Sequence, residues 1–310
     1  VKDDHCQLLT EQVSHYPPIT AFDCTSLDPK LPYHLYGEQE FKNKFWGKTA
    51  EITPQGSFQL HDELHNEHYS WNKTKIKLSN IIIGTPWSDI NGDITLRNHT
   101  TGEVAKITIK KARNKDHVGN VAGVVYDAYH NPCYHISGNH MKGIYVDVDS
   151  SMQGQVPEPA KRLMFMPTPM PLDYDKQYHM TQHAFTLNEM TAKQQRELPP
   201  TDSRRRPDQL KLEQGFVQDS TVEKFRLEQK ELKEMKELKA SGQMHNPPVW
   251  FTRQDGVNTD RPFFSVKQHD PSGQSFDGSV VFKFNDKYWP ARESNRRGEH
   301  DWEQCPTVFD

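Results

Sequence analysis

Residues 105–110 read Ala-Lys-Ile-Thr-Ile-Lys, and this stretch decides the fold class. Its apolar side chains alternate with polar ones, which is the period of a β-strand with one face in water. The same alternation returns in residues 75–78, Lys-Ile-Lys-Leu, and in other short runs up to about residue 150. This part of the chain is therefore predicted to form many short strands of a sheet that has one wet face.

Turn-forming residues separate these runs at Pro54-Gln55-Gly56, Asn91-Gly92-Asp93 and Thr100-Thr101-Gly102. Such short connections are typical of hairpins in an antiparallel sheet, not of crossover units in a parallel one. A continuous sheet of so many strands usually curls or closes. We expect a mainly β, α+β fold in which residues 1–165 form most of a large antiparallel, barrel-like sheet.

The character of the sequence changes after about residue 150. Residues 157–171 contain Pro and Met and are interpreted as an extended covering segment or linker. Residues 178–195 are predicted to form a helix that ends at Leu198-Pro199-Pro200, because proline cannot continue a helix. A short helix is expected over residues 208–214. A long helix is expected over residues 220–240, where Lys and Glu recur at three- and four-residue spacings.

Short aromatic strands are expected to return at residues 262–266 and 280–284. Residues 166–310 are thus interpreted as a helical and mixed subdomain of the same domain. Because the long helix has a high density of charge, we expect it to lie outside the barrel.

Composition narrows the function classes. The 310 residues carry a formal net charge of -4, with 34% hydrophobic residues, and the mean hydropathy is -0.90. No global positive charge is available to hold nucleic acid. The four cysteines form no C-x-x-C pair, which fits a reducing cytosolic setting. No apolar run is long enough to span a membrane. The chain opens at Val1 inside a stretch that is interpreted as a strand, so we expect a natural N-terminal part to precede it.

Residues 11–18 read Glu-Gln-Val-Ser-His-Tyr-Pro-Pro. This resembles the signature E-Q-V-S-H-H-P-P of the oxysterol-binding protein family, with Tyr16 in place of the second histidine. Further segments resemble the same family in the same order. They are Tyr69-Ser70-Trp71 with Asn80 to Gly84 and Trp87, Leu198 to Arg204 with Arg206 to Gln209, Glu223-Lys224 with Arg226 to Glu228, and the tail from Tyr288-Trp289 to Cys305-Pro306.

The resemblance implies a nearly closed antiparallel barrel around a lipid tunnel, a helical C-terminal part packed outside it, and a lid that would precede Val1. It also implies a non-vesicular lipid transfer protein that carries a sterol or a phospholipid between membranes. Exchange of that lipid for phosphatidylinositol 4-phosphate is the most specific form of this expectation. The expected location is the cytoplasm, peripherally at organelle membranes and membrane contact sites.

The resemblance further assigns a lipid headgroup site to His15, Tyr16, Lys224 and Glu228. The family uses the two positions of its His-His pair and the Lys at the position of Lys224 for contact with a phosphoinositide phosphate. Glu228 lies four residues beyond Lys224, and an ordinary helix salt bridge is the alternative interpretation of that pair. Two positions depart from the family pattern, because Tyr16 replaces a histidine and Leu232 stands where the family has an arginine. Tyr16 can still donate one hydrogen bond.

The residue types themselves suit a phosphate. A phosphomonoester carries close to two negative charges and several acceptor oxygens, so its site must present cations and hydrogen-bond donors. His15 offers a donor near neutral pH, and Lys224 is a compact cation. Pro17 and Pro18 cannot continue a strand ladder and would hold the preceding side chains at a strand end.

Other possible sites have less support in the sequence than the headgroup site. His61, His65 and His68 suggest a metal site, but a zincin needs Glu directly after its first His, and Asp62 stands there. Ser14 beside His15 is not a nucleophile and base, since neighbours on a strand point to opposite faces. The glycines form no phosphate-binding loop. We therefore expect neither an enzyme nor a resident cofactor or metal.

Two functions remain open at this point. The first is a lipid carrier between membranes, whose partners are its lipid ligand and, transiently, the membrane surface. The second is a lipid sensor or scaffold that uses the same pocket without transporting. Tyr16 and Leu232 favour the second slightly, because they alter two phosphate-binding positions.

Overall fold

The computed structural model describes residues 5–15, 17–113, 118–149, 161–176, 179–241, 247–254, 282–299 and 302–310. The chain divides into two compact units. Unit 1 comprises Val1–Gln12, Pro17–Thr168 and Arg253–Phe282, and unit 2 comprises Val13–Tyr16, Pro169–Thr252 and Lys283–Asp310. No described helix is both long and apolar enough to cross a membrane.

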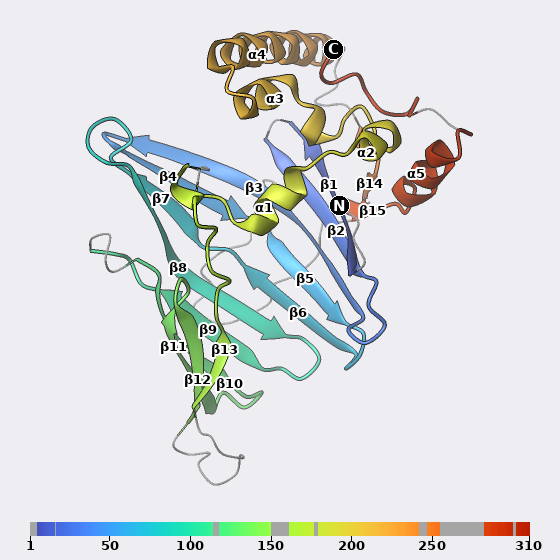
Figure 1. Cartoon of the computed structure of the whole chain (residues 1–310). Helices are drawn as coiled ribbons and strands as arrows, with labels where there is room; N and C mark the ends of the chain where they lie inside the picture. The colour runs from blue at the N-terminus through green and yellow to red at the C-terminus, as the bar shows by residue number, and fades with distance from the viewer. Residues whose placement is uncertain are drawn as a thin grey trace. The chain divides into compact units, whose positions relative to one another are not determined.

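Unit 1 is built on one large sheet of 13 strands (Figure 1). Every strand pair whose register the described residues define is antiparallel, as the hairpin signals predict. The strands are β1 (Cys6–Ser14), β2 (Ile19–Ser26), β3 (Tyr33–Trp46), β4 (Thr49–Gln55), β5 (Ser57–Asp62), β6 (Glu67–Asn72), β7 (Lys75–Ser79), β8 (Trp87–Asn98), β9 (Val104–Ile109), β10 (Asn120–Tyr126), β11 (Pro132–Asn139), β12 (Gly143–Val148) and β13 (Lys161–Phe165).

The sheet branches between its two longest strands. The first half of β3 pairs with β5 and its second half with β4. On the other side, β8 pairs with both β6 and β7. Two short strand pairs, β4 with β7 and β5 with β6, thus lie between two long strands, and Gly56, with φ +97°, makes the turn from β4 into β5.

One predicted turn is wrong. Asn91-Gly92-Asp93 does not connect two strands but lies inside β8, where Asn91 still pairs with β7 and Gly92 already pairs with β9. Gly92 has φ +128°, a conformation that costs other residues energy. The glycine therefore serves a change of pairing partner within a strand, which looks the same in sequence as a hairpin turn.

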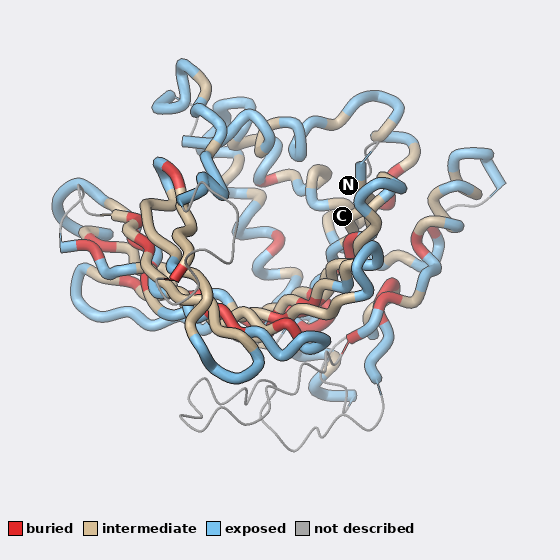
Figure 2. The backbone as a smooth tube through the Cα atoms, turned by 90° about the horizontal axis from the view of Figure 1, so that it is seen from below, coloured by how far each residue is buried: buried red, intermediate tan, exposed pale blue. Residues whose placement is uncertain are grey.

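The sheet is strongly curved, as predicted (Figure 2). Its strand order runs from β1 at one end to β13 at the other, and these two strands are not paired with each other among the described residues. The expectation of a large antiparallel sheet is confirmed, whereas the ladder described is an open curved sheet and not a closed barrel.

One face of the sheet is apolar across most of its width. Directly paired residues place their side chains on the same face. One such row is continuous over nine strands, and it consists of Phe22, Gly37, Phe58, Trp71, Leu96, Ala105, Val125, Tyr134 and Val148. A parallel row consists of Ile94, Ile107, Gly123, Ile136 and Val146. We call these the two apolar rows.

A glycine lets the aromatic rings at one end of the first row pack together. The rings of Phe22 and Phe58 lie 4.8 Å apart, and those of Phe58 and Trp71 lie 5.4 Å apart. Gly37 stands between Phe22 and Phe58 in the row, and a Cβ atom there would lie 2.8 Å from the Phe22 ring. Because Gly37 has no side chain, the rings of Phe22 and Phe58 have room to contact each other.

The opposite face carries a histidine row on the same strands. His34, His61 and His68 are directly paired across β3, β5 and β6, and the backbone N–H of His99 donates to the carbonyl of His68. The His61 and His68 rings stack 4.3 Å apart, and the His68 and His99 rings 4.8 Å apart.

Polar partners surround the histidine row. His34 contacts the Asp23 carboxylate at 2.6 Å, Gln59 Oε1 lies 2.8 Å from His68, and Ser70 Oγ lies 2.7 Å from His99. Glu63 acts on His61 and Arg97 on His99 through longer-range charge. Desolvation by burial, followed by the neighbouring cations, lowers the pKa values of His61, His68 and His99.

Unit 2 contains the helices. They are α1 (Gln182–Asn188), α2 (Ala192–Glu197), α3 (Pro207–Glu213), α4 (Val217–Ala240) and α5 (Tyr288–Arg296), with 3₁₀ turns η3 (Tyr174–Lys176) and η4 (Ser203–Arg205). The predictions of helices at 208–214 and 220–240 are confirmed. The pair β14 (Phe251–Arg253) and β15 (Phe282–Phe284) forms a small second sheet, and the predicted strand at 262–266 lies outside the described residues.

The single helix predicted over 178–195 is two helices, and Tyr178 lies outside the described residues. Thr191 caps the second helix, because its hydroxyl accepts from the Gln194 N–H at 3.2 Å while the Gln194 side chain accepts from the Thr191 N–H at 2.8 Å. This capping box begins a new helix in the middle of a helix-like pattern. The predicted end before Pro199 is confirmed, since α2 ends at Glu197.

We expect the stability of unit 1 to fall as the pH is lowered from about 7 to about 5, because the lowered pKa values of His61, His68 and His99 favour neutral imidazoles and an unfolded chain binds their protons near pH ~6.5. A folded-state pKa below the unfolded value means that stability is lost as pH falls through that window. His68→Gln should make the dependence shallower. Urea unfolding at a series of pH values measures this, and an unchanged slope in the variant would contradict it.

Candidate functional site

Strand β1 delivers the predicted headgroup residues to its end. Val13 and Ser14 are buried there, whereas His15 follows in a turn and is exposed. Pro17 and Pro18 come next and end the ladder, as the sequence predicts, before β2 begins at Ile19. Tyr16, the other predicted member, lies outside the described residues.

His15 contacts the long helix of unit 2. Its Nε2 atom lies 2.6 Å from Glu231 Oε1 on α4, and the two side chains are 45% and 49% exposed. A half-exposed pair of this kind contributes about 0–1 kcal/mol to stability. The contact orients the imidazole, yet another acceptor could replace the carboxylate at little energetic cost.

The same face of α4 carries the predicted lysine. Lys224, Glu228 and Glu231 are spaced four and seven residues apart, which places them on one side of the helix. Lys224 Nζ lies 4.0 Å from Glu228 Oε1, with the two side chains 62% and 50% exposed. Seven residues correspond to about 10.5 Å along a helix axis. His15 therefore contacts α4 about two turns from Lys224 on the Lys224 face.

One of the two departures from the family pattern, Leu232, also lies on α4. Leu232 is 44% exposed, so an apolar side chain meets solvent at the position of the family's arginine. Lys233, next to it, pairs with Glu237 at 3.9 Å. Lys233 is thus engaged within the helix, although its side chain is 78% exposed.

Other contacts of α4 hold the helix in place within unit 2. Arg226 Nη2 donates to the carbonyl of Phe309 at 2.8 Å, and Lys230 Nζ donates to the carbonyl of Asp310 at 2.9 Å. Near the start of the helix, Ser220 Oγ donates to the carbonyl of Asp208 at 2.8 Å. Leu227 is buried. The C-terminal tail and the turn of α3 thus position the helix that presents Lys224.

The site has two potential donors to an anion, His15 and Lys224, and each is near a carboxylate. Glu231 Oε1 lies 2.6 Å from His15 Nε2, and Glu228 Oε1 lies 4.0 Å from Lys224 Nζ. Ser14 Oγ, beside His15, is buried and has no hydrogen-bond partner among the described residues. Sequence reasoning missed Glu231, although its seven-residue spacing from Lys224 placed it on the Lys224 face.

The alternative metal cluster does not assemble. His61 and His68 are stacked on the sheet, whereas His65 lies in the β5–β6 turn with Nδ1 2.7 Å from Asp62 Oδ2. No group of three or more His, Cys, Asp or Glu residues in the described part of the chain is arranged to hold a metal ion.

Comparison with known proteins covers nearly the whole chain. The family described as "Oxysterol-binding protein" matches residues 1–293. Human oxysterol-binding protein-related protein 7 is 30% identical over 283 residues, which is 89% of this chain and 32% of the relative. Oxysterol-binding protein-related protein 1B of Arabidopsis thaliana is 29% identical over 99% of this chain and 54% of the relative. The chain thus spans only about a third to a half of these two relatives.

Solved structures show the same fold. The Osh1 ORD domain in complex with cholesterol superimposes with a TM-score of 0.75 at 24% identity, over 94% of this chain and 67% of that chain. The Osh3 ORD of Saccharomyces cerevisiae in complex with PI(4)P gives 0.71 at 20% identity, over 98% of this chain and 70% of that chain. The ordered motifs, the curved antiparallel sheet and the family match agree, and the chain belongs to the oxysterol-binding protein family.

Proposed function

We propose that this chain binds a lipid and moves it between membranes, with the apolar rows of unit 1 contacting its sterol or acyl part. The observation that carries this proposal is the continuity of those rows over β2 to β12. The proteins of the oxysterol-binding family are lipid-binding proteins and not enzymes, and the function proposed for this chain needs no catalytic group.

The apolar rows suit a lipid because they are only partly covered. Phe22, Phe58, Trp71 and Leu96 are half-buried, and so are Ile94, Ile107, Ile136 and Val146 in the second row. Apolar side chains that line a continuous surface gain roughly 25 cal/mol per Å² when a ligand removes them from water. Such a surface accepts a sterol or an acyl chain by shape and area, without a specific polar contact.

We further propose that His15 and Lys224, with Glu228 as the helix partner of Lys224 and Tyr16 as an additional donor, bind a lipid phosphate on unit 2. The exposed pairs of His15 with Glu231 and of Lys224 with Glu228 support this, because a phosphate brings more charge and more acceptor oxygens than either carboxylate. Relatives bind ligands of both kinds, since Osh1 holds cholesterol or ergosterol and Osh3 holds PI(4)P. Exchange of one for the other is the finer proposal.

Lys224→Ala should weaken phosphoinositide binding by about tenfold or more, because a charge-assisted hydrogen bond contributes roughly 1.5–3 kcal/mol. Sterol binding should change little. Titration of the intact protein with phosphatidylinositol 4-phosphate and with a fluorescent sterol measures both.

Lys236→Ala is the matched control, since Lys236 is an exposed lysine of the same helix outside the Lys224 face. Glu231→Gln is the companion variant and should not weaken phosphoinositide binding, because it removes a negative charge beside His15. Equal losses in Lys224→Ala and Lys236→Ala would show that only the general charge of α4 matters.

A substitution in the apolar rows should have the opposite selectivity to Lys224→Ala. Leu96→Gln places an amide in the middle of the first row, and it should lower sterol binding by about tenfold while phosphoinositide headgroup binding is retained, because burial of an unpaired amide is costly. The binding titrations for Lys224→Ala apply here too, with thermal unfolding to confirm that the sheet is intact. A folded variant with unchanged sterol affinity would exclude the rows as the binding surface.

A lipid carrier accelerates lipid transfer between membranes, whereas a lipid sensor does not. The intact protein should accelerate sterol transfer between donor and acceptor liposomes, and phosphatidylinositol 4-phosphate in the acceptor should increase the rate further if exchange operates. Stoichiometric lipid binding with no acceleration would instead support the alternative, a lipid sensor or scaffold, which the changes at Tyr16 and Leu232 favour.

A further inference from the structure

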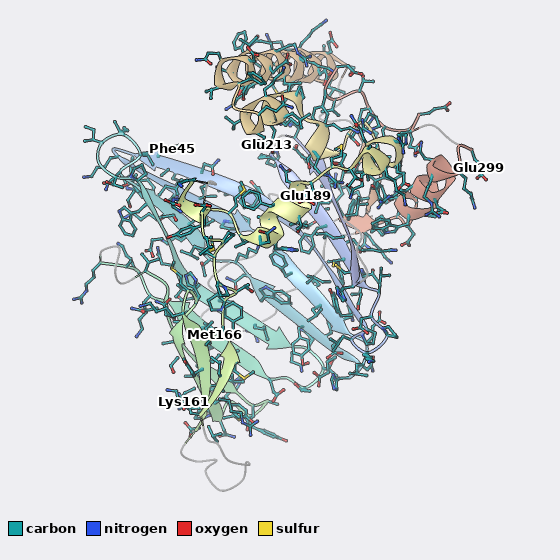
Figure 3. The ribbon with its side chains drawn as sticks, viewed as in Figure 1. Phe45, Lys161, Met166, Glu189, Glu213 and Glu299 are labelled. Atoms are coloured by element: carbon teal, nitrogen blue, oxygen red, sulfur yellow. The ribbon has the colours of Figure 1, made fainter. Side chains whose placement is uncertain are left out.

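Two loops of unit 1 project from one end of the sheet. One is the turn between β3 and β4, and the other is the loop of residues 80–86 between β7 and β8. They are joined, since Thr49 pairs with Ser79 and the Ile81 N–H donates to the carbonyl of Lys48 at 3.1 Å. Figure 3 labels Phe45 at this end.

The tips of these loops are apolar and exposed. Phe45 is 73% exposed, Ile82 is 72% exposed and Ile83 is 76% exposed. Trp46 and Ile81 belong to the same surface and are also exposed. We call these five residues the loop-tip surface. A contiguous group of exposed large apolar side chains marks an interaction site far more often than an isolated one does.

The charged residues of the two loops and their flanking strand ends are all lysines. Residues 41–50 and 73–87 together contain six lysines and no Asp or Glu, in a chain whose net charge is -4. Lys42, Lys44 and Lys48 are exposed beside Phe45 and Trp46. This end of the sheet is therefore locally basic on an acidic protein.

A third segment extends the basic region. Lys111 and Arg113, which follow β9, line one shallow hollow together with Lys77, Trp87 and Asp89. The Asp89 carboxylate is buried and accepts hydrogen bonds from the Ala112 N–H at 3.1 Å and from Asn91 at 2.9 Å.

A second carboxylate near this end has a cationic partner. Glu51, on β4, pairs with Lys75 at 3.4 Å and its side chain is only 16% exposed. Glu51 thus offsets the charge of Lys75 and not that of the exposed lysines in the β3–β4 turn.

We propose that the loop-tip surface docks unit 1 on an anionic bilayer, with Phe45, Trp46, Ile82 and Ile83 entering the headgroup region and the surrounding lysines contacting lipid phosphates. This rests on the proposed function insofar as a lipid carrier must reach a membrane. Trp and apolar side chains settle at headgroup depth, and clustered Lys/Arg residues are attracted to anionic lipids.

A bilayer fits this surface better than a protein partner does. Lysine is depleted in protein–protein interfaces, and it is the main charged residue here. A strongly hydrated point charge suits a diffuse headgroup layer. Phe45, Trp46, Ile82 and Ile83 also sit on two projecting tips, whereas Ile81 lines a small hollow beside Leu78 and Trp87.

The β1–β2 turn points in the same direction along the sheet as the loop-tip surface. Ile19 opens β2 directly after Pro17 and Pro18, and it pairs with Glu40 in the middle of β3, six residues before Trp46. Six strand residues correspond to about 20 Å. Docking at the loop tips would therefore orient Pro17 and Pro18 toward the bilayer without placing them in it.

The test is flotation of the intact protein with phosphatidylcholine vesicles that do or do not contain phosphatidylserine. Ile82→Ser with Ile83→Ser should weaken binding to the anionic vesicles by at least about tenfold, since each isoleucine loses much of its burial energy. Lys44→Glu with Lys48→Glu should weaken it several-fold and make binding less sensitive to salt.

Leu31→Ser with Leu64→Ser is the matched control. Both leucines are exposed, at 63% and 57%, and they lie in turns at the other end of β3. Thermal unfolding confirms that each variant is folded. Equal vesicle binding by the isoleucine variant and the wild type would overturn the proposal, and so would retained vesicle binding combined with loss of a protein partner.

Delivery of the lipid without a bilayer separates this proposal from the proposed function. The isoleucine variant should still load sterol from a cyclodextrin complex, because its apolar rows are unchanged. An intact wild-type protein that docks on vesicles yet loads no lipid by any route would refute lipid carriage and leave the docking surface standing.

Discussion

The pairing register of the sheet is the constraint on which the rest of unit 1 depends. Because side chains alternate between faces, a slip of one residue between two strands would exchange the apolar rows for the histidine row or its polar neighbours. The register from Phe22 to Val148 is kept across nine strands. The structure thereby separates a lipid-compatible face from a polar one, although both come from the same short strands.

Helix α4 combines contacts that hold it in place with exposed ion pairs at the proposed headgroup site. Arg226 and Lys230 hold the C-terminal tail through backbone carbonyls, and Leu227 is buried. The ion pairs described on the Lys224 face, in contrast, are half-exposed, so they contribute little to stability and are screened by salt. A strong buried pair would be harder for a ligand to displace. The proposed headgroup site thus depends on contacts other than those that hold the helix in place.

The loops at the end of the sheet would extend this arrangement to the membrane under the docking proposal. Lysines attract an anionic surface over about a Debye length, and a few apolar side chains add short-range binding. The two contributions act at different distances, so each can be weakened separately by substitution.

The sequence by itself determined the strands, the long charged helix and the order of family motifs, because these depend on local periodicity and on short residue patterns. The alternation in residues 105–110 placed β9 correctly, and the Lys and Glu spacing placed α4. The turn assigned at Asn91-Gly92-Asp93 failed, because a glycine within a strand and a glycine in a hairpin look alike until the pairing partners are known. The break at Thr191 was equally invisible to a helix-length pattern. Only the tertiary structure decided that β3 serves three neighbouring strands, that four histidines form one row, and that Glu231 contacts His15. Each of these depends on which residues far apart in the chain become neighbours, and local propensity carries no information about that.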